Sequence, residues 1–248
     1  MEKITLFILV LLTTFVTINA EIKGKTMTPG YAEIVKCPYC GAETELMTHA
    51  SGNTFGAEYW SDNKCIAPML PKVSFVQKCH NCGKYYVKYK QQIKTGTKTS
   101  FEKGELCYPE WKEPYAQFLQ ESQRTEEYTR KETRLGGTDW TEIRMCLIHA
   151  YNDCFYRANV NDEEAASDEE HQFVVGVIND FIDTFDWSKV EKPLLKAELY
   201  REANEMEKCT EVLSVMSGKG MNSFERGIYD EIKERMERGD TKVFKLGM

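Results

Sequence analysis

Two short segments of this chain carry the residue types and spacing that could do chemistry. The segments Cys37–Gly41 and Cys79–Gly83 both have the form Cys-x-x-Cys-Gly. Two thiolates two residues apart in a tight turn can bind one face of a tetrahedral metal ion, and two such turns complete the ligand set of a structural Zn²⁺ site. No catalytic and no cofactor-binding residue is predicted. The predicted metal ligands are Cys37, Cys40, Cys79 and Cys82.

Both turns resemble the knuckles of the zinc-ribbon and rubredoxin-like families, whose commonest form is Cys-Pro-x-Cys-Gly. The resemblance implies a small antiparallel β domain around zinc, with iron as the rubredoxin-like alternative. Ribbons usually separate their two pairs by roughly 15–20 residues, whereas Gly41 to Lys78 spans 38 residues here. We therefore expect one shared site with a hairpin inserted between the pairs. The alternatives are two separate metal sites, two disulfides, four unrelated thiols or a redox dithiol.

The charge of the 248-residue chain is divided unevenly along its length. Residues 21–103 contain 12 Lys, no Arg and 7 acidic residues, a net charge of +5, whereas residues 104–248 contain 19 basic and 31 acidic residues, a net charge of −12. Opposite signs in the two parts indicate two domains. An apolar content of 42% is enough for a packed core and argues against general disorder.

The first of these domains is predicted to contain short strands. Apolar and polar residues alternate over 54–60 and 85–89, as in half-buried strands, and a further short strand is expected at 32–36. Together with the knuckles, these segments predict a zinc-ribbon domain with an inserted hairpin over residues 31–101.

The second domain is predicted to be helical over residues 110–240. Pro114 is expected in the first turn of its first helix. Later helices are expected to start at residue pairs with the spacing of a capping box. These pairs are Asp139 with Glu142, Ser167 with Glu170, Ser188 with Glu191, and Asn222 with Glu225. The predicted fold class is thus α+β, a small antiparallel β ribbon followed by an all-α domain.

Residues 192–216 resemble one tetratricopeptide hairpin, in which small and aromatic residues recur at fixed places. The resemblance implies two antiparallel helices, and no second copy follows at a 34-residue period. The matching residues are Ala197, Tyr200, Asn204, Met206, Cys209 and Leu213.

Residues 1–20 have the pattern of a secretory signal peptide. Lys3 precedes an apolar run from Ile4 to Val16, and Ala20 is a small residue at the expected cleavage point. We therefore expect an exported protein, either secreted or periplasmic. The alternative is a cytoplasmic protein that starts at Met27. The apolar run is too short for a stable membrane span.

Three residues of a predicted helix could form a second site. Cys146, His149 and Asp153 follow one another at intervals of three and four residues. On a helix this spacing could bring together a thiol, a base and an orienting carboxylate. They could also contribute to a second metal site, but packing on an amphipathic helix is the preferred interpretation. Cys65 and Cys107, near the ribbon, are alternative metal ligands without a paired turn.

A strand rich in lysine and tyrosine follows the second knuckle. Lysines with interleaved tyrosines could bind a nucleic-acid backbone and stack on bases. An isoelectric point near 5.3 and the lack of arginine in this part favour an edge strand with solubilising lysines. The residues are Lys84, Lys88, Lys90, Lys94, Lys98, Tyr85, Tyr86 and Tyr89.

Taken together, these features favour a zinc-binding protein-interaction module over an enzyme. In this module the metal is structural and the helical domain binds a protein partner. The layout resembles that of uncharacterised bacterial proteins that pair a ribbon with a helical tail. An iron redox protein and a nucleic-acid contact are the alternatives. Substitution of Cys37 or Cys79 should unfold the ribbon and leave the helices largely intact.

Overall fold

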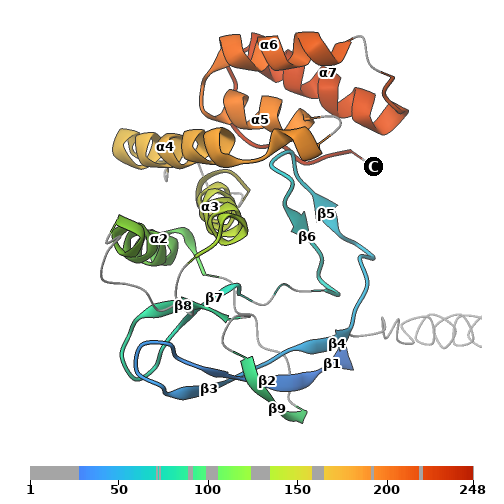
Figure 1. Cartoon of the computed structure of the whole chain (residues 1–248). Helices are drawn as coiled ribbons and strands as arrows, with labels where there is room; N and C mark the ends of the chain where they lie inside the picture. The colour runs from blue at the N-terminus through green and yellow to red at the C-terminus, as the bar shows by residue number, and fades with distance from the viewer. Residues whose placement is uncertain are drawn as a thin grey trace, which may run out of the picture.

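The chain folds as an α+β protein, with short antiparallel strands in its N-terminal part and helices in its C-terminal part (Figure 1). The predicted fold class is confirmed. The predicted signal peptide, residues 1–20, lies outside the described residues. The computed structural model describes residues 28–70, 72, 74–88, 92–98, 106–123, 135–157, 165–190, 193–217 and 220–247.

The strands of the described residues form four small antiparallel groups. β2 lies between β3 and β9, and the other pairs are β1 with β4, β5 with β6, and β7 with β8. The strands are β1 Thr28–Pro29, β2 Tyr31–Lys36, β3 Glu43–Leu46, β4 His49–Ser51, β5 Glu58–Tyr59, β6 Cys65–Ile66, β7 Val76–Lys78, β8 Tyr85–Val87 and β9 Gln92–Lys98.

One strand of the inserted segment is shorter than its alternation predicts. The strand expected over 54–60 is reduced to β5, because the chain turns just before it. Gly56 has a φ of 71°, and the amide of Ala57 donates to the carbonyl of Thr54 at 3.0 Å. A positive φ is readily adopted by glycine and breaks the extended backbone.

The helices pack above the strands (Figure 1). A π-helical turn, Asp153–Arg157, continues α3. The helices are α2 Tyr108–Gln123, α3 Gly137–Asn152, α4 Asp168–Thr184, α5 Leu194–Glu202, α6 Met206–Ser217 and α7 Ser223–Glu237. None of the helices in the described ranges is long and apolar enough to cross a membrane.

Two of the expected capping boxes are confirmed. Ser167 and Glu170 exchange hydrogen bonds at the start of α4, and Asn222 and Glu225 do so at the start of α7. Such boxes satisfy amide groups that have no partner within the helix.

Other helix starts differ from the prediction. Asp139 is not the cap of α3 but its third residue, where its carboxylate accepts from the amide of Gly136 at 2.6 Å. The helix expected at Ser188 begins instead at Leu194, because Asp186 caps a short 3-10 turn over Trp187–Lys189.

The first helix also starts earlier than expected. Pro114 lies inside α2 rather than in its first turn. The start is set by Glu110, whose carboxylate accepts from the amide of Cys107 at 2.9 Å. This local bond supplies the partner that an amide at a helix start needs.

The hairpin expected over residues 192–216 is present as α5 and α6. Asn204 ends the first helix with a φ of 62°, a left-handed conformation that asparagine tolerates. Ala197 and Cys209 are fully buried in the same cluster, which allows the two helices to approach closely. The structure therefore shows a helical hairpin, while its place in a repeat family stays a prediction.

The main hydrophobic core is shared by the ribbon and the helices. Val76, Tyr85 and Val87 of β7 and β8 are buried in one cluster with side chains of α2, α3 and α4. A second cluster lies among α5, α6 and α7, and a third surrounds the cysteines of the ribbon. The hairpin β7–β8 thus belongs structurally to both parts of the chain.

The inserted segment also reaches the C-terminal tail. Figure 1 shows the hairpin β5–β6 extending from the strand layer to α5 and the tail. The amide of Ser61 donates to the carbonyl of Phe244 at 2.9 Å, and the amide of Leu246 donates to the carbonyl of Tyr59 at 2.8 Å. The insert is therefore held by main-chain hydrogen bonds to the far end of the sequence.

Candidate metal centre

The four cysteines of the two knuckles lie together. The Sγ atoms of Cys37 and Cys82 are 3.7 Å apart, those of Cys40 and Cys79 are 3.6 Å apart, and all four lie within 4.8 Å of one another. The pairs therefore meet in one cluster and do not form two separate sites. No other group of three or more metal-binding side chains is found among the described residues.

Both knuckles have the same local structure, and each forms the turn of a hairpin. The amide of Cys37 donates to the carbonyl of Ala42, and the amide of Cys79 donates to the carbonyl of Lys84, both at 2.8 Å. The glycine after each pair has a positive φ, 79° at Gly41 and 71° at Gly83. The repeated glycine in the motif thus has a conformational reason.

The spacing of the sulfur atoms fits a tetrahedral metal ion. Metal–sulfur bonds of about 2.3 Å place the corners of a regular tetrahedron about 3.8 Å apart. Disulfide sulfurs lie about 2.05 Å apart, and none of the nine cysteines forms a disulfide. Four sulfurs fill every position of the tetrahedron, which is the arrangement of a structural site rather than a catalytic one.

The thiols differ in acidity when no metal is bound. A hydrogen bond from the side chain of Asn81 contributes most to lowering the pKa of Cys40, to about 6. Burial raises the pKa of Cys37 to about 12. A metal ion binds thiolates, so its binding must release the protons that thiols such as Cys37 retain.

The first knuckle is connected to helix α2 through side chains. The hydroxyl of Tyr39 donates to the carboxylate of Glu121 at 2.8 Å and accepts from the amide of Gln117 at 3.2 Å. Gln117 also accepts from the main-chain amide of Tyr85 at 3.0 Å and donates to the carbonyl of the same residue at 2.8 Å. One glutamine thus connects α2 with both knuckles.

The alternative ligands near the ribbon lie outside the cluster. Cys107 donates from its thiol to Glu110 at 3.1 Å, a hydrogen bond that raises the pKa of Cys107. Cys65 lies in β6, and His80, exposed in the second knuckle, has its Nδ1 3.2 Å from the hydroxyl of Thr44. None of these three belongs to the four-thiol group.

Cys146, His149 and Asp153 line one cavity but do not form the relay that their spacing suggested. Asp153 accepts from the guanidinium of Arg157 at 2.8 Å and pairs with the ammonium of Lys64. His149 instead donates from Nε2 to the main-chain carbonyl of Asp62 at 3.0 Å. The carboxylate of Asp153 is therefore engaged by cations rather than by the histidine.

The tyrosines of β8 are poorly placed for stacking on bases. Tyr85 and Tyr86 are buried, and Lys88 pairs with Glu33 at 3.1 Å. The ammonium of Lys84 lies 4.5 Å from the centre of the Tyr39 ring. Lys90 and Tyr89 lie outside the described residues. These contacts give the described part of the lysine and tyrosine strand a structural role.

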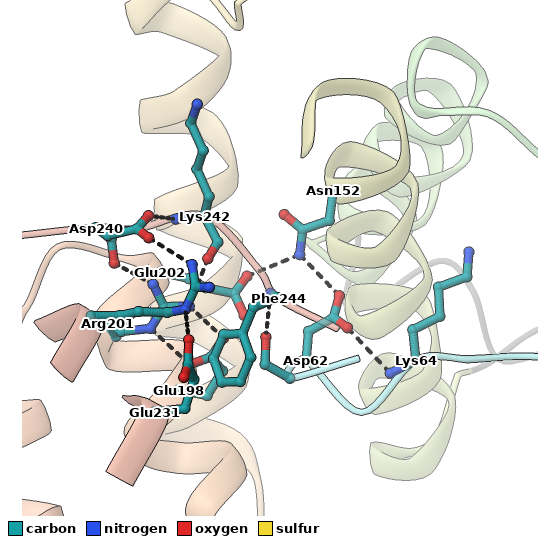
Figure 2. A network of polar contacts seen from close by, with 12 residues as sticks. Asp62, Lys64, Asn152, Glu198, Arg201, Glu202, Glu231, Asp240, Lys242 and Phe244 are labelled. Atoms are coloured by element: carbon teal, nitrogen blue, oxygen red, sulfur yellow. Dashed lines mark hydrogen bonds and ion pairs between the residues drawn. The ribbon is translucent and has the colours of Figure 1, made fainter. Parts of the chain in front are cut away.

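A buried polar network escaped the sequence analysis (Figure 2). Asp62, at the tip of the hairpin β5–β6, is fully buried and accepts from Arg157 at 2.8 Å and from Asn152 at 3.0 Å. Asn152 also donates to Glu202 at 2.9 Å. These partners are 50 to 95 residues apart in sequence, so no local pattern indicates them.

A second part of the network holds the C-terminal tail. Arg201 and Glu198 are fully buried on α5 and joined by hydrogen bonds of 2.8 and 2.5 Å. Arg201 also donates to the carbonyl of Lys242 at 2.9 Å and to that of Asp240 (Figure 2). The guanidinium therefore compensates a buried carboxylate and binds the tail at once.

Comparison of the chain with protein-family models, with curated proteins and with solved structures gave no match. What can be said of function therefore rests on the arrangement of this chain's own residues. Among the described residues, the four-thiol cluster is the arrangement with the clearest chemistry.

Proposed function

We propose that this chain is a non-enzymatic zinc-binding protein in which the metal is structural and the helical part binds a protein partner. The proposal is carried by one observation, the four thiols of Cys37, Cys40, Cys79 and Cys82 gathered within 4.8 Å of one another. Four sulfur ligands leave no position for a substrate or an activated water, as a catalytic zinc requires. The metal would fix two turns of a domain with little core of its own.

Iron is the alternative metal, because four thiolates in paired knuckles also suit rubredoxin-like iron. Zinc has no redox chemistry in proteins, and its sites do not absorb visible light. Elemental analysis of protein purified from its native compartment tests the proposal. One equivalent of zinc and a colourless solution support it, whereas one equivalent of iron with visible absorption supports the redox alternative.

The helical part offers features suited to a protein partner. Val215 on α6 and Phe224 on α7 are exposed by 68% and 45%, and the sequence from residue 104 onward has a net charge of −12. Exposed apolar side chains within an acidic surface suit a partner with a basic rim around apolar contacts. Light scattering of the complex isolated with its native partner should give a mass above that of one chain. The substitution Val215→Asp should return the mass to that of one chain.

Export is part of the same proposal and depends on the predicted signal peptide at residues 1–20. The mass of the mature protein tests it directly, because cleavage after Ala20 removes 20 residues. A protein that begins at Met27 would support the cytoplasmic alternative. A nucleic-acid contact is tested by a gel shift at low salt, which the buried Tyr85 and Tyr86 lead us not to expect.

A further inference from the structure

A cavity of about 470 Å³ lies between the ribbon and helix α3, away from the four thiols. Cavities of about 300–1,000 Å³ are the usual size of sites for small molecules. One side of the wall is apolar, with Phe75 from the segment before β7, Trp111 from α2, and Met145 and Ala150 from α3. The indole of Trp111 and the methyl group of Ala150 belong to the buried core, so this side of the wall is firmly held.

The charged residues of the wall are balanced in sign. Among the described residues, three lysines and three carboxylates line the cavity. Two pairs are already formed, one between Lys88 and Glu33 at 3.1 Å and one between Lys64 and Asp153. The remaining lysine and the remaining carboxylate, Lys72 and Glu142, are exposed and form no ion pair with any described residue. The wall therefore offers one uncompensated charge of each sign.

A balanced wall disfavours a ligand with a net charge. Such a ligand would pair with one of Lys72 and Glu142 and would be repelled by the other, which carries a charge of the ligand's own sign. A wholly apolar ligand would pair with neither residue. A molecule that carries an ammonium and a carboxylate can instead pair with both residues while its side group packs on Trp111 and Phe75.

His149 also lines the cavity, and its ring has one nitrogen that can accept a hydrogen bond. Its Nε2 donates to the carbonyl of Asp62 at 3.0 Å, which leaves Nδ1 of the neutral ring as an acceptor. Burial lowers the pKa of His149, so the ring stays neutral at pH 7. A neutral histidine can accept from an ammonium group without repelling it.

We propose that this cavity binds a small zwitterion with one apolar side group, of the size of an apolar amino acid or a dipeptide. The ammonium group lies toward Glu142 and the carboxylate toward Lys72. This inference goes beyond the proposed function, since neither the metal nor a protein partner is part of the site.

The proposal is tested by calorimetric titration of the full, metal-loaded chain with L-phenylalanine and the dipeptide Ala-Phe. We expect at least one of them to bind with a Kd of about 1 mM or below, a modest affinity for a ligand of this size. Phenethylamine, which lacks the carboxylate, and 3-phenylpropionate, which lacks the ammonium, should each bind about tenfold more weakly or worse, because a charged hydrogen bond is lost. The proposal is overturned if neither zwitterion binds at about 10 mM, or if a singly charged analogue binds equally well.

Substitutions of the two exposed charged residues of the cavity wall, Glu142 and Lys72, test where the ligand binds. Glu142→Gln should weaken binding of the zwitterion about tenfold, and Lys72→Gln should do the same. Glu207→Gln makes the same charge change as Glu142→Gln at an exposed position of α6 outside the cavity lining, and should leave binding unchanged. Equal effects of Glu142→Gln and Glu207→Gln would mean that the ligand binds elsewhere.

The thiol of Cys146 lines the cavity and provides a second readout. Bound ligand should slow alkylation of Cys146 by iodoacetamide, measured residue by residue in a mass spectrometer. The exposed Cys107, which does not line the cavity, should react at an unchanged rate. Binding that leaves the reaction of Cys146 unaffected would also overturn the proposal.

Discussion

Loss of the metal should weaken the helices as well as the ribbon. The perturbation is Cys37→Ser, which removes one sulfur of the four-thiol cluster and changes few other atoms. Structural zinc contributes apparent binding free energies of about 10–16 kcal/mol in small zinc-binding peptides. This exceeds or matches the whole stability of most domains, about 5–15 kcal/mol. Without the metal, we therefore expect the two knuckles to separate.

The shared core determines how far this disruption spreads. Val76, Tyr85 and Val87 belong to the hairpin turned by the second knuckle, and all three are buried against the helices. Full burial of one such side chain contributes about 1.5–3 kcal/mol, so exposing all three removes roughly 4–9 kcal/mol. The sequence alone led us to expect intact helices in this variant, whereas the packing predicts that their melting temperature falls too.

The assay combines elemental analysis with thermal melting followed by circular dichroism at the helical minimum. Cys65→Ser is the matched control, because Cys65 is a free cysteine of the ribbon outside the cluster. Cys37→Ser should lose the metal and have a lower melting temperature. A chelator should lower the melting temperature of the wild-type protein in the same way. The reasoning is refuted if Cys37→Ser keeps a full equivalent of metal. It is also refuted if the variant loses the metal while the melting temperature of the helices is unchanged.

Three further predictions concern single side chains. Burial, together with the nearby carboxylates, raises the pKa of Glu202 well above its usual value of 4.5. The folded chain thus keeps a proton that the unfolded chain releases, and stability should fall as pH rises above the unfolded value. Glu202→Gln should remove this loss, so denaturant unfolding should show higher stability than wild type at about pH 8 and little change at about pH 5. Arg201→Met should destabilise the chain by about 3–5 kcal/mol, because it leaves the buried Glu198 unpaired. The double variant with Glu198→Gln should be more stable than the single one in the same unfolding assay, and equal values would contradict the pairing. Gln117→Ala should cost about 1–3 kcal/mol by breaking both bonds to the main chain of β8, whereas Gln120→Ala, exposed on the same helix, should change the denaturation midpoint little.

The features that sequence predicted are those whose causes are local. Each knuckle is a turn of a few residues whose glycine needs a positive φ, as at Gly41 and Gly83. The caps at Ser167 and Asn222 likewise depend on a residue three positions later. Such signals are complete within one stretch of chain, which explains why the thiol cluster, the fold class and two helix starts could be read from the sequence.

The features that sequence missed depend on distant partners. Asp62 is an ordinary turn residue by its neighbours, yet it is fully buried against Arg157, 95 positions away. Aspartate and arginine are usually exposed, so neither type indicates a buried pair. Helix starts were misplaced for a different reason, since more than one residue near Asp139 and Pro114 could act as a cap. In the structure, Asp139 and Glu110 each accept from the main-chain amide three residues earlier.

The long separation between the knuckles has a structural explanation. The insert carries the hairpin β5–β6, which delivers Asp62 to the end of α3 and pairs with the tail at Phe244. The second knuckle contacts the helices independently, through the bonds between Tyr85 and Gln117. One contact alone would leave the ribbon free to pivot, whereas two contacts at different places fix its orientation. A ribbon of usual spacing lacks the residues for the second contact, so the insert adds a second attachment to the core that β7 and β8 already share with the helices. Together, the two attachments hold the walls of the cavity between ribbon and helices at a fixed separation.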